Sequence, residues 1–209
     1  MPFIDVPGNR LEKQQNNTSC WISVAHFVSL YFPHPSSREE LLARFQHVPA
    51  NAHDVMAGAG NPVTVLQALG FRCEKVAAAD VDHAALFTRI RASIAAGLPV
   101  MCFLRAGAAF NWFRHGVVIT GVDATTGEVR LKDPAREPTD IQQMREVVFR
   151  DLVDGNFLYG TYRPNQYEAR QVYAYVTHVV FTQDQGRVVF AADRAIPAAF
   201  RRPNQMYAR

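Results

Sequence analysis

The sequence predicts an α+β protein in which helices come first and an antiparallel sheet follows. Two observations support this prediction. Before Gly97 the apolar residues recur with helical spacing, whereas after it they form short, compact runs of strand length. We therefore expect a single domain, residues 1–209, with a helical half at about 1–97 and a sheet half at about 98–209.

The first expected helix is buried on all sides. Residues 21–32 are apolar almost all the way round, and Pro33 ends the segment. A capping box, Ser-Arg-Glu-Glu at 37–40, predicts a second helix. Two further helices are expected at about 62–69 and 80–96, each followed by a glycine.

The expected strands are rich in β-branched and aromatic residues. One short strand is expected near the amino terminus, before Pro7, and the others follow Gly97. They lie at about 3–6, 99–104, 116–120, 128–132, 171–182 and 186–191. A turn at 121–127 joins two of them into a hairpin.

Composition excludes several functions. The chain has 22 Lys and Arg against 19 Asp and Glu, a net charge of +3, with no run of like charges, so we expect no nucleic-acid partner. No stretch resembles a cleavable signal peptide or a membrane span, so we expect no membrane partner. Three cysteines are too few for a disulfide framework, and no spacing matches a metal site, so neither a metal nor a cofactor is expected.

Cys20 is the candidate nucleophile. It opens the first expected helix, directly before Trp21. The amino terminus of a helix carries partial positive charge and unpaired N–H groups, which favour a thiolate over a thiol. The two other cysteines, Cys73 and Cys102, lie in apolar segments and are expected in the core.

His115 and Asp133 are the candidate base and its orienting carboxylate. If the turn pairs Val122 with Glu128, then Val117 faces Asp133, and His115 is a diagonal neighbour of Asp133 on the same face. A slip of one residue would separate the two side chains. Asp123 is the fallback partner for His115.

A glutamine ahead of Cys20 is the candidate oxyanion donor. The side chain of Gln14, six positions earlier, could act together with the backbone N–H of Cys20. Gln15 is the competing candidate.

Together these residues resemble a known group. Gln14-x5-Cys20-Trp21, GLPVMCFL at 97–104, HGVVITGVD at 115–123 and VRLKDP at 129–134 look like bacterial papain-like cysteine peptidases. The resemblance is to AvrRpt2-type effector peptidases and to C39-type bacteriocin-processing peptidases, and Trp21 favours the first type. It implies a papain-like fold with the helix of the nucleophile packed on the sheet. It also implies catalysis by Cys20, His115 and Asp133 through a thioester, with Gln14 in the oxyanion hole.

The resemblance also suggests a biological setting. It implies a protein or peptide substrate, an immunity or inhibitor protein as a candidate partner, and a bacterial effector or toxin made in the cytoplasm and secreted into a target cell without a cleavable signal peptide. Two alternatives stay open: a deamidase, transglutaminase or acyltransferase with the same residues, and a non-catalytic peptide-binding module. The near-copies RPNQYEAR (163–170) and RPNQMYAR (202–209) have no assigned role.

Overall fold

The structure of the protein is a computed structural model. It describes residues 3–8, 11–12, 20–32, 37, 41, 63, 66–67, 71–107, 110, 114–135, 145–162 and 168–184. The strand expected at 186–191 lies outside these residues, as do Gln14 and Gln15. Most of the helix expected from 37 and most of the helix expected at 62–69 lie outside them too.

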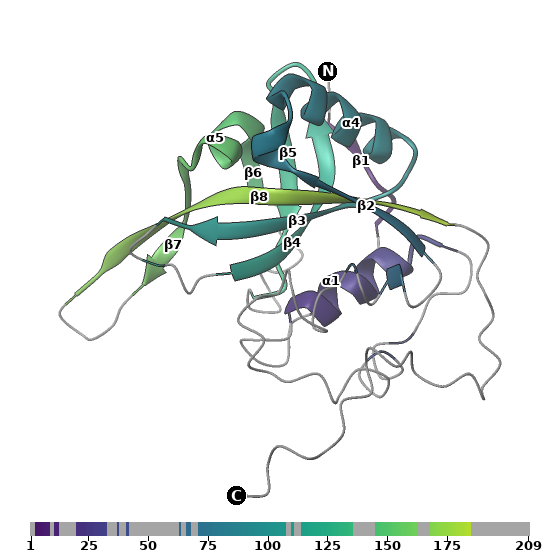
Figure 1. Cartoon of the computed structure of the whole chain (residues 1–209), viewed down its shortest axis with the longest axis horizontal. Coiled ribbons are helices and arrows are strands. Elements are labelled where there is room, and N and C mark those ends of the chain that lie inside the picture. Colours follow the sequence, from purple (N-terminus) through teal and green to yellow (C-terminus); the bar gives the residue numbers. More distant parts are fainter. Residues whose placement is uncertain are drawn as a thin grey trace, which may run out of the picture.

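The strands of the described chain form one eight-stranded antiparallel sheet (Figure 1). Its main path runs β2–β8–β3–β4–β5–β6, while β1 pairs with β4 and β7 pairs with β8. The strands are β1 (Ile4–Asp5), β2 (Phe71–Ala77), β3 (Val100–Ala106), β4 (Arg114–Asp123), β5 (Glu128–Lys132), β6 (Arg145–Val148), β7 (Phe157–Tyr162) and β8 (Arg170–Asp184). The helices are α1 (Cys20–Ser29), η1 (Ala78–Asp80), α4 (His83–Ala95) and α5 (Phe149–Asp154).

The sheet is covered on both faces, with α1 on one face and α4 and α5 on the other (Figure 1). Successive residues of a strand point to opposite faces, so each central strand supplies two cores. The core under α1 contains Phe27, Val28, Met101, Phe103 and Val118. The core under α4 and α5 contains Leu86, Ile90, Cys102, Val117, Ile119 and Leu131. The α+β class expected from the sequence is confirmed.

Several boundaries differ from those expected. Strand β2 lies inside the expected helical half but pairs with β8 as part of the sheet. It is an edge strand whose charged residues Arg72, Glu74 and Lys75 hide the alternation of apolar residues. Strand β6, helix α5 and strand β7 were not predicted; β6 has a single buried residue, Val147, so its sequence carries almost no strand signal.

The register between β4 and β5 contains a β-bulge. The turn pairs Val122 with Val129, so the expected pairing of Val122 with Glu128 is wrong by one residue. A register shift between Ile119 and Gly121 restores the expected alignment, and Val118 lies opposite Lys132. The bulge therefore corrects the register at the end of the hairpin where His115 and Asp133 lie.

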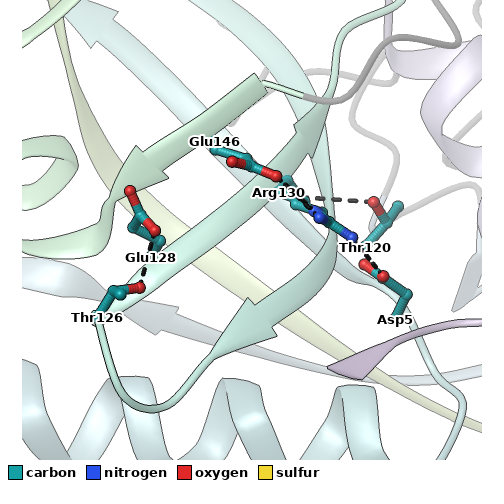
Figure 2. A network of polar contacts seen from close by, with 6 residues as sticks. All are labelled: Asp5, Thr120, Thr126, Glu128, Arg130 and Glu146. Carbon is teal, nitrogen blue, oxygen red and sulfur yellow. Dashed lines mark hydrogen bonds and ion pairs between the residues drawn. The ribbon is translucent and has the colours of Figure 1, made fainter. Parts of the chain in front are cut away.

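Arg130 ties three strands together beside this bulge (Figure 2). Its guanidinium donates to Asp5 on β1 and, at 2.8 and 3.0 Å, to Glu146 on β6. At Gly121 a Cβ atom would collide with the Asp5 carboxylate, so glycine is needed for this close approach. The network in Figure 2 also includes a hydrogen bond from the Thr120 hydroxyl to the carbonyl of Arg130.

We expect Ile90→Ala to destabilise the fold strongly. Ile90 is fully buried on α4, and deleting its buried methyl groups leaves a cavity that costs about 2–5 kcal/mol. The free energy of unfolding in urea measures the loss. Arg91→Ala, on the exposed side of the same helix, is the control and should change stability by less than about 0.5 kcal/mol. Equal effects of the two substitutions would contradict the assignment of Ile90 to the core.

Candidate active site

Cys20 is the first residue of α1 and is 3% exposed. The helix is buried along its whole length, as its apolar sequence predicts, and this packing fixes its first residue against the sheet. The Cys20 side chain is hydrogen-bonded to His115, and the backbone N–H groups of Trp21 and Gly116 donate to its sulfur. The start of α1 and the start of β4 thus together surround the sulfur with donors.

His115 and Asp133 are in direct contact. The Nε2 atom of His115, near the start of β4, lies 2.6 Å from Oδ1 of Asp133, the residue after β5. The two residues are 6% and 4% exposed, so water hardly reaches the pair. Because Nε2 faces Asp133, Nδ1 is the ring nitrogen left for Cys20. The proximity of His115 and Asp133 expected from the hairpin is confirmed.

The proton equilibria of the three groups are strongly perturbed. Burial alone raises the pKa of the Cys20 thiol, but His115 and the backbone N–H groups of Gly116 and Trp21 together outweigh burial and hold the pKa below its ordinary value. Burial alone lowers the pKa of His115, yet the Asp133 carboxylate, together with Cys20, raises it to about 10. Burial raises the pKa of Asp133, but the charge of His115 and its hydrogen bonds lower it to about 2. All three shifts favour the charged forms, a thiolate beside an imidazolium and a carboxylate.

Asp133 receives two further hydrogen bonds. The backbone N–H of Ala135 donates to Oδ1 at 2.9 Å, and the hydroxyl of Tyr159 donates to the same carboxylate. Tyr159 was not identified from the sequence. It lies 26 residues beyond Asp133 on a strand that carries no motif, so no local signal marks it.

The other candidates lie elsewhere. Asp123, the fallback partner, accepts hydrogen bonds from the backbone of Thr125 and Thr126 in the β4–β5 turn and takes no part in the cluster. Burial raises the pKa of the Cys73 thiol to about 12 and raises that of Cys102 further, so both stay protonated. Gln14 and Gln15 lie outside the described residues.

The described part of the chain lacks both a metal-binding cluster and a membrane-spanning helix. It contains no cluster of three or more His, Cys, Asp or Glu that could hold a metal ion. None of its helices is long and apolar enough to cross a membrane.

Selective alkylation of Cys20 follows from these shifts. We expect iodoacetamide to modify Cys20 well below pH 8.5, the ordinary pKa of a thiol, because the thiolate is the reacting species. Cys73 and Cys102 should stay unmodified in the same samples, which makes them internal controls. His115→Ala should move the Cys20 profile to higher pH. Peptide mass spectrometry from pH 4 to 9 measures all three thiols, and an ordinary profile for Cys20 in the unsubstituted protein would contradict the geometry.

The buried pair should also make stability depend on pH. The raised pKa of His115 contributes stability that is complete below 6.5 and is lost as the pH rises towards about 10. The lowered pKa of Asp133 contributes stability that is complete above 3.8 and is lost as the pH falls towards about 2. Asp133→Asn should therefore cost more stability at pH 5.5 than at pH 10. Urea unfolding in a Cys20→Ser background, which removes the thiolate, measures the difference; equal costs at both pH values would refute the coupling.

Comparison with known proteins places the chain in a family. The peptidase domain of Streptococcus ComA, a bi-functional ABC transporter involved in quorum sensing, is a similar solved structure, with a TM-score of 0.48 and 14% identity over 85% of this chain and 100% of that chain. The curated proteins contain no match. The family model described as papain-like cysteine protease AvrRpt2 matches residues 3–150, more than half of the chain, and the matched segment contains Cys20, His115 and Asp133. The resemblance found in the sequence is thus confirmed: this chain belongs to the AvrRpt2 family of papain-like cysteine proteases and is a cysteine peptidase.

Proposed function

We propose that Cys20, His115 and Asp133 carry out the peptidase reaction. Cys20 is the nucleophile, His115 is the general acid and base, and Asp133 holds the ring of His115 in place. The observation that carries this proposal is the continuous buried contact from the sulfur of Cys20 through His115 to Asp133. The segment that matches the family of papain-like cysteine proteases, residues 3–150, contains all three residues.

The reaction follows from the charged state of the cluster. The thiolate of Cys20 attacks the carbonyl carbon of the scissile peptide bond, and the carbonyl oxygen takes the negative charge. The C–N bond then breaks as His115 gives its Nδ1 proton to the leaving amine, which leaves a thioester on Cys20. Neutral His115 next accepts a proton from water, the resulting hydroxide attacks the thioester, and the acid product leaves as the thiolate and imidazolium form again.

The developing oxyanion requires hydrogen-bond donors beside Cys20. The start of α1 provides the backbone N–H of Cys20 and a favourable helix dipole for a developing negative charge. We assign the second donor to the side chain of Gln14, with Gln15 as the alternative. The spacing in the sequence and the resemblance support this assignment.

We also propose that the peptidase is a bacterial effector or toxin that acts on a protein inside a target cell, with an immunity or inhibitor protein as its partner in the producing cell. This proposal rests on the resemblance of the segments around Cys20 and 115–134 to effector peptidases. Production of the wild-type chain and of Cys20→Ala inside candidate target cells tests it. Loss of viability or cleavage of a host protein only with the wild type would support the proposal. If cells that produce the wild type and cells that produce Cys20→Ala show the same viability and the same intact proteins in every candidate host, the result would argue against it.

Product analysis separates a peptidase from the alternative acyl-transfer enzymes. A deamidase, transglutaminase or acyltransferase would form the same thioester and give it to a different acceptor. A peptidase leaves a cleaved chain, whereas the alternatives leave an intact chain whose side-chain mass has changed. The reacting geometry at Cys20 is common to both, so only the product decides.

The central experiment is cleavage of a peptide library with readout by mass spectrometry. We expect Cys20→Ala to abolish cleavage and His115→Ala to lower kcat by about 10²–10⁴-fold, the usual contribution of a general acid and base. Cys73→Ser is the matched control, since its thiol lies outside the cluster, and it should retain full activity.

Three results would distinguish a peptidase from an acyl-transfer enzyme and from a non-catalytic binding module. Cleavage that depends on Cys20 supports the proposed roles. A Cys20-dependent change of side-chain mass without cleavage would move the assignment to an acyl-transfer enzyme. No reaction of any kind, combined with an unreactive Cys20, would favour the non-catalytic binding module.

A further inference from the structure

Tyr159 occupies a β-bulge on β7. Leu158 pairs with Tyr173 of β8, and Gly160 pairs with Val172, so Tyr159 is an extra residue between two ladder positions. A bulge leaves one residue out of the regular alternation and redirects its side chain. Here the redirected side chain lies over the site: the rings of Tyr159 and His115 meet edge to face, with centroids 5.7 Å apart.

The same side chain reaches the carboxylate that holds His115. The Tyr159 hydroxyl donates a hydrogen bond to Asp133. Together with Nε2 of His115 and the N–H of Ala135, it is the third donor to a carboxylate that is 4% exposed. A carboxylate held by several donors keeps its charge and its orientation. One tyrosine therefore contacts both members of the His115–Asp133 pair.

Arg145 on β6 holds this bulge in place. Its two terminal nitrogens donate to the carbonyl oxygens of Tyr159 and Leu158, at 2.9 and 2.8 Å. The guanidinium also lies over the ring of Phe157, 4.5 Å from the centroid. A planar, forked guanidinium can bind two neighbouring carbonyls at once. The backbone of Tyr159 is thus fixed from β6 and from β8, on both sides.

We propose that Tyr159 is a positioning residue of the peptidase, which acts through Asp133 and His115 without touching the substrate. Its hydroxyl holds the Asp133 carboxylate towards Nε2 of His115, and its ring shields the contact between them from water. Exclusion of water strengthens the interaction between the two charges. This role rests on the proposed function of Cys20, His115 and Asp133.

Tyr159→Phe tests the role of the hydroxyl. This variant keeps the ring and removes one hydrogen bond to a charged group, so we expect kcat to fall about 10-fold or more with KM unchanged. Asp133 should then bind its proton more readily, so the acid limb of the kcat profile and of Cys20 alkylation should move to higher pH. Tyr159→Leu, which also removes the ring, should lower kcat further.

Tyr173→Phe is the matched control. Tyr173 lies opposite Leu158 on β8, is 45% exposed and donates its hydroxyl to Gln171, so this variant removes the same group from the same hairpin. It should keep the wild-type kcat and pH profile. Thermal unfolding of all variants shows whether each one folds.

The outcomes separate this role from the proposed function. A lower kcat with a shifted acid limb in Tyr159→Phe supports the positioning role. A wild-type profile, or a loss of activity with an unmoved acid limb, overturns that role while leaving the proposed function intact. If the unsubstituted protein itself shows no activity and an ordinary Cys20 thiol, the proposed function fails, and the positioning role fails with it.

Discussion

The contact between His115 Nε2 and Asp133 Oδ1, at 2.6 Å, is the constraint on which the rest of the site depends. It joins two strands, so it exists only in one register of the β4–β5 hairpin, and a slip of one residue would turn the side chains to opposite faces. The register at the turn is offset by one from the register at the site, and the bulge between Ile119 and Gly121 absorbs the difference. The Arg130 network holds that bulge between β1, β5 and β6 (Figure 2). Side chains far from the thiol thereby set the geometry that perturbs its pKa.

Removing the charges of Cys20, His115 and Asp133 from water costs free energy, and hydrogen-bond donors in the protein offset this desolvation penalty by replacing the solvent. Burial of a charge destabilises the folded state by several kcal/mol unless the charge is paired and hydrogen-bonded. Cys20 has His115 and two backbone N–H groups, and Asp133 has His115, Ala135 and Tyr159. Each anionic group thus accepts hydrogen bonds from more than one donor, and His115 is only one of them. This arrangement also explains why the cluster is preorganised: donors that are fixed by backbone and strands need not rearrange when charge moves during the reaction.

The sequence predicted the parts of the site whose signals are local. Cys20 is marked by the start of an apolar helix, and His115 and Asp133 by the hairpin between them. Tyr159 could not be predicted, because its place depends on the pairing of β7 with β8 and on a bulge held by Arg145 from a third strand. The strands of the fold also differ in how clearly the sequence marks them. The central strands were recognised from their buried apolar runs. The edge strands β2 and β6 were missed because exposed charged residues interrupt their pattern.

The nucleophile and the His–Asp pair share the core under α1, and the hairpin of the pair also packs into the second core. Cys20 is positioned by α1, whose residues Phe27 and Val28 belong to the core on one face of the sheet. The β4–β5 hairpin that carries His115 and Asp133 contributes Val118 to this same core, and it contributes Val117 and Leu131 to the core on the other face. A change at the bulge of Tyr159 would act first on Asp133, which the Tyr159 hydroxyl contacts. The pKa of His115 is raised mainly by Asp133 and further by Cys20, and His115 in turn lowers the pKa of Cys20, so the sheet and the helix together favour the charged forms. The β4–β5 hairpin positions His115 against Asp133, and helix α1 places the thiol of Cys20 beside His115.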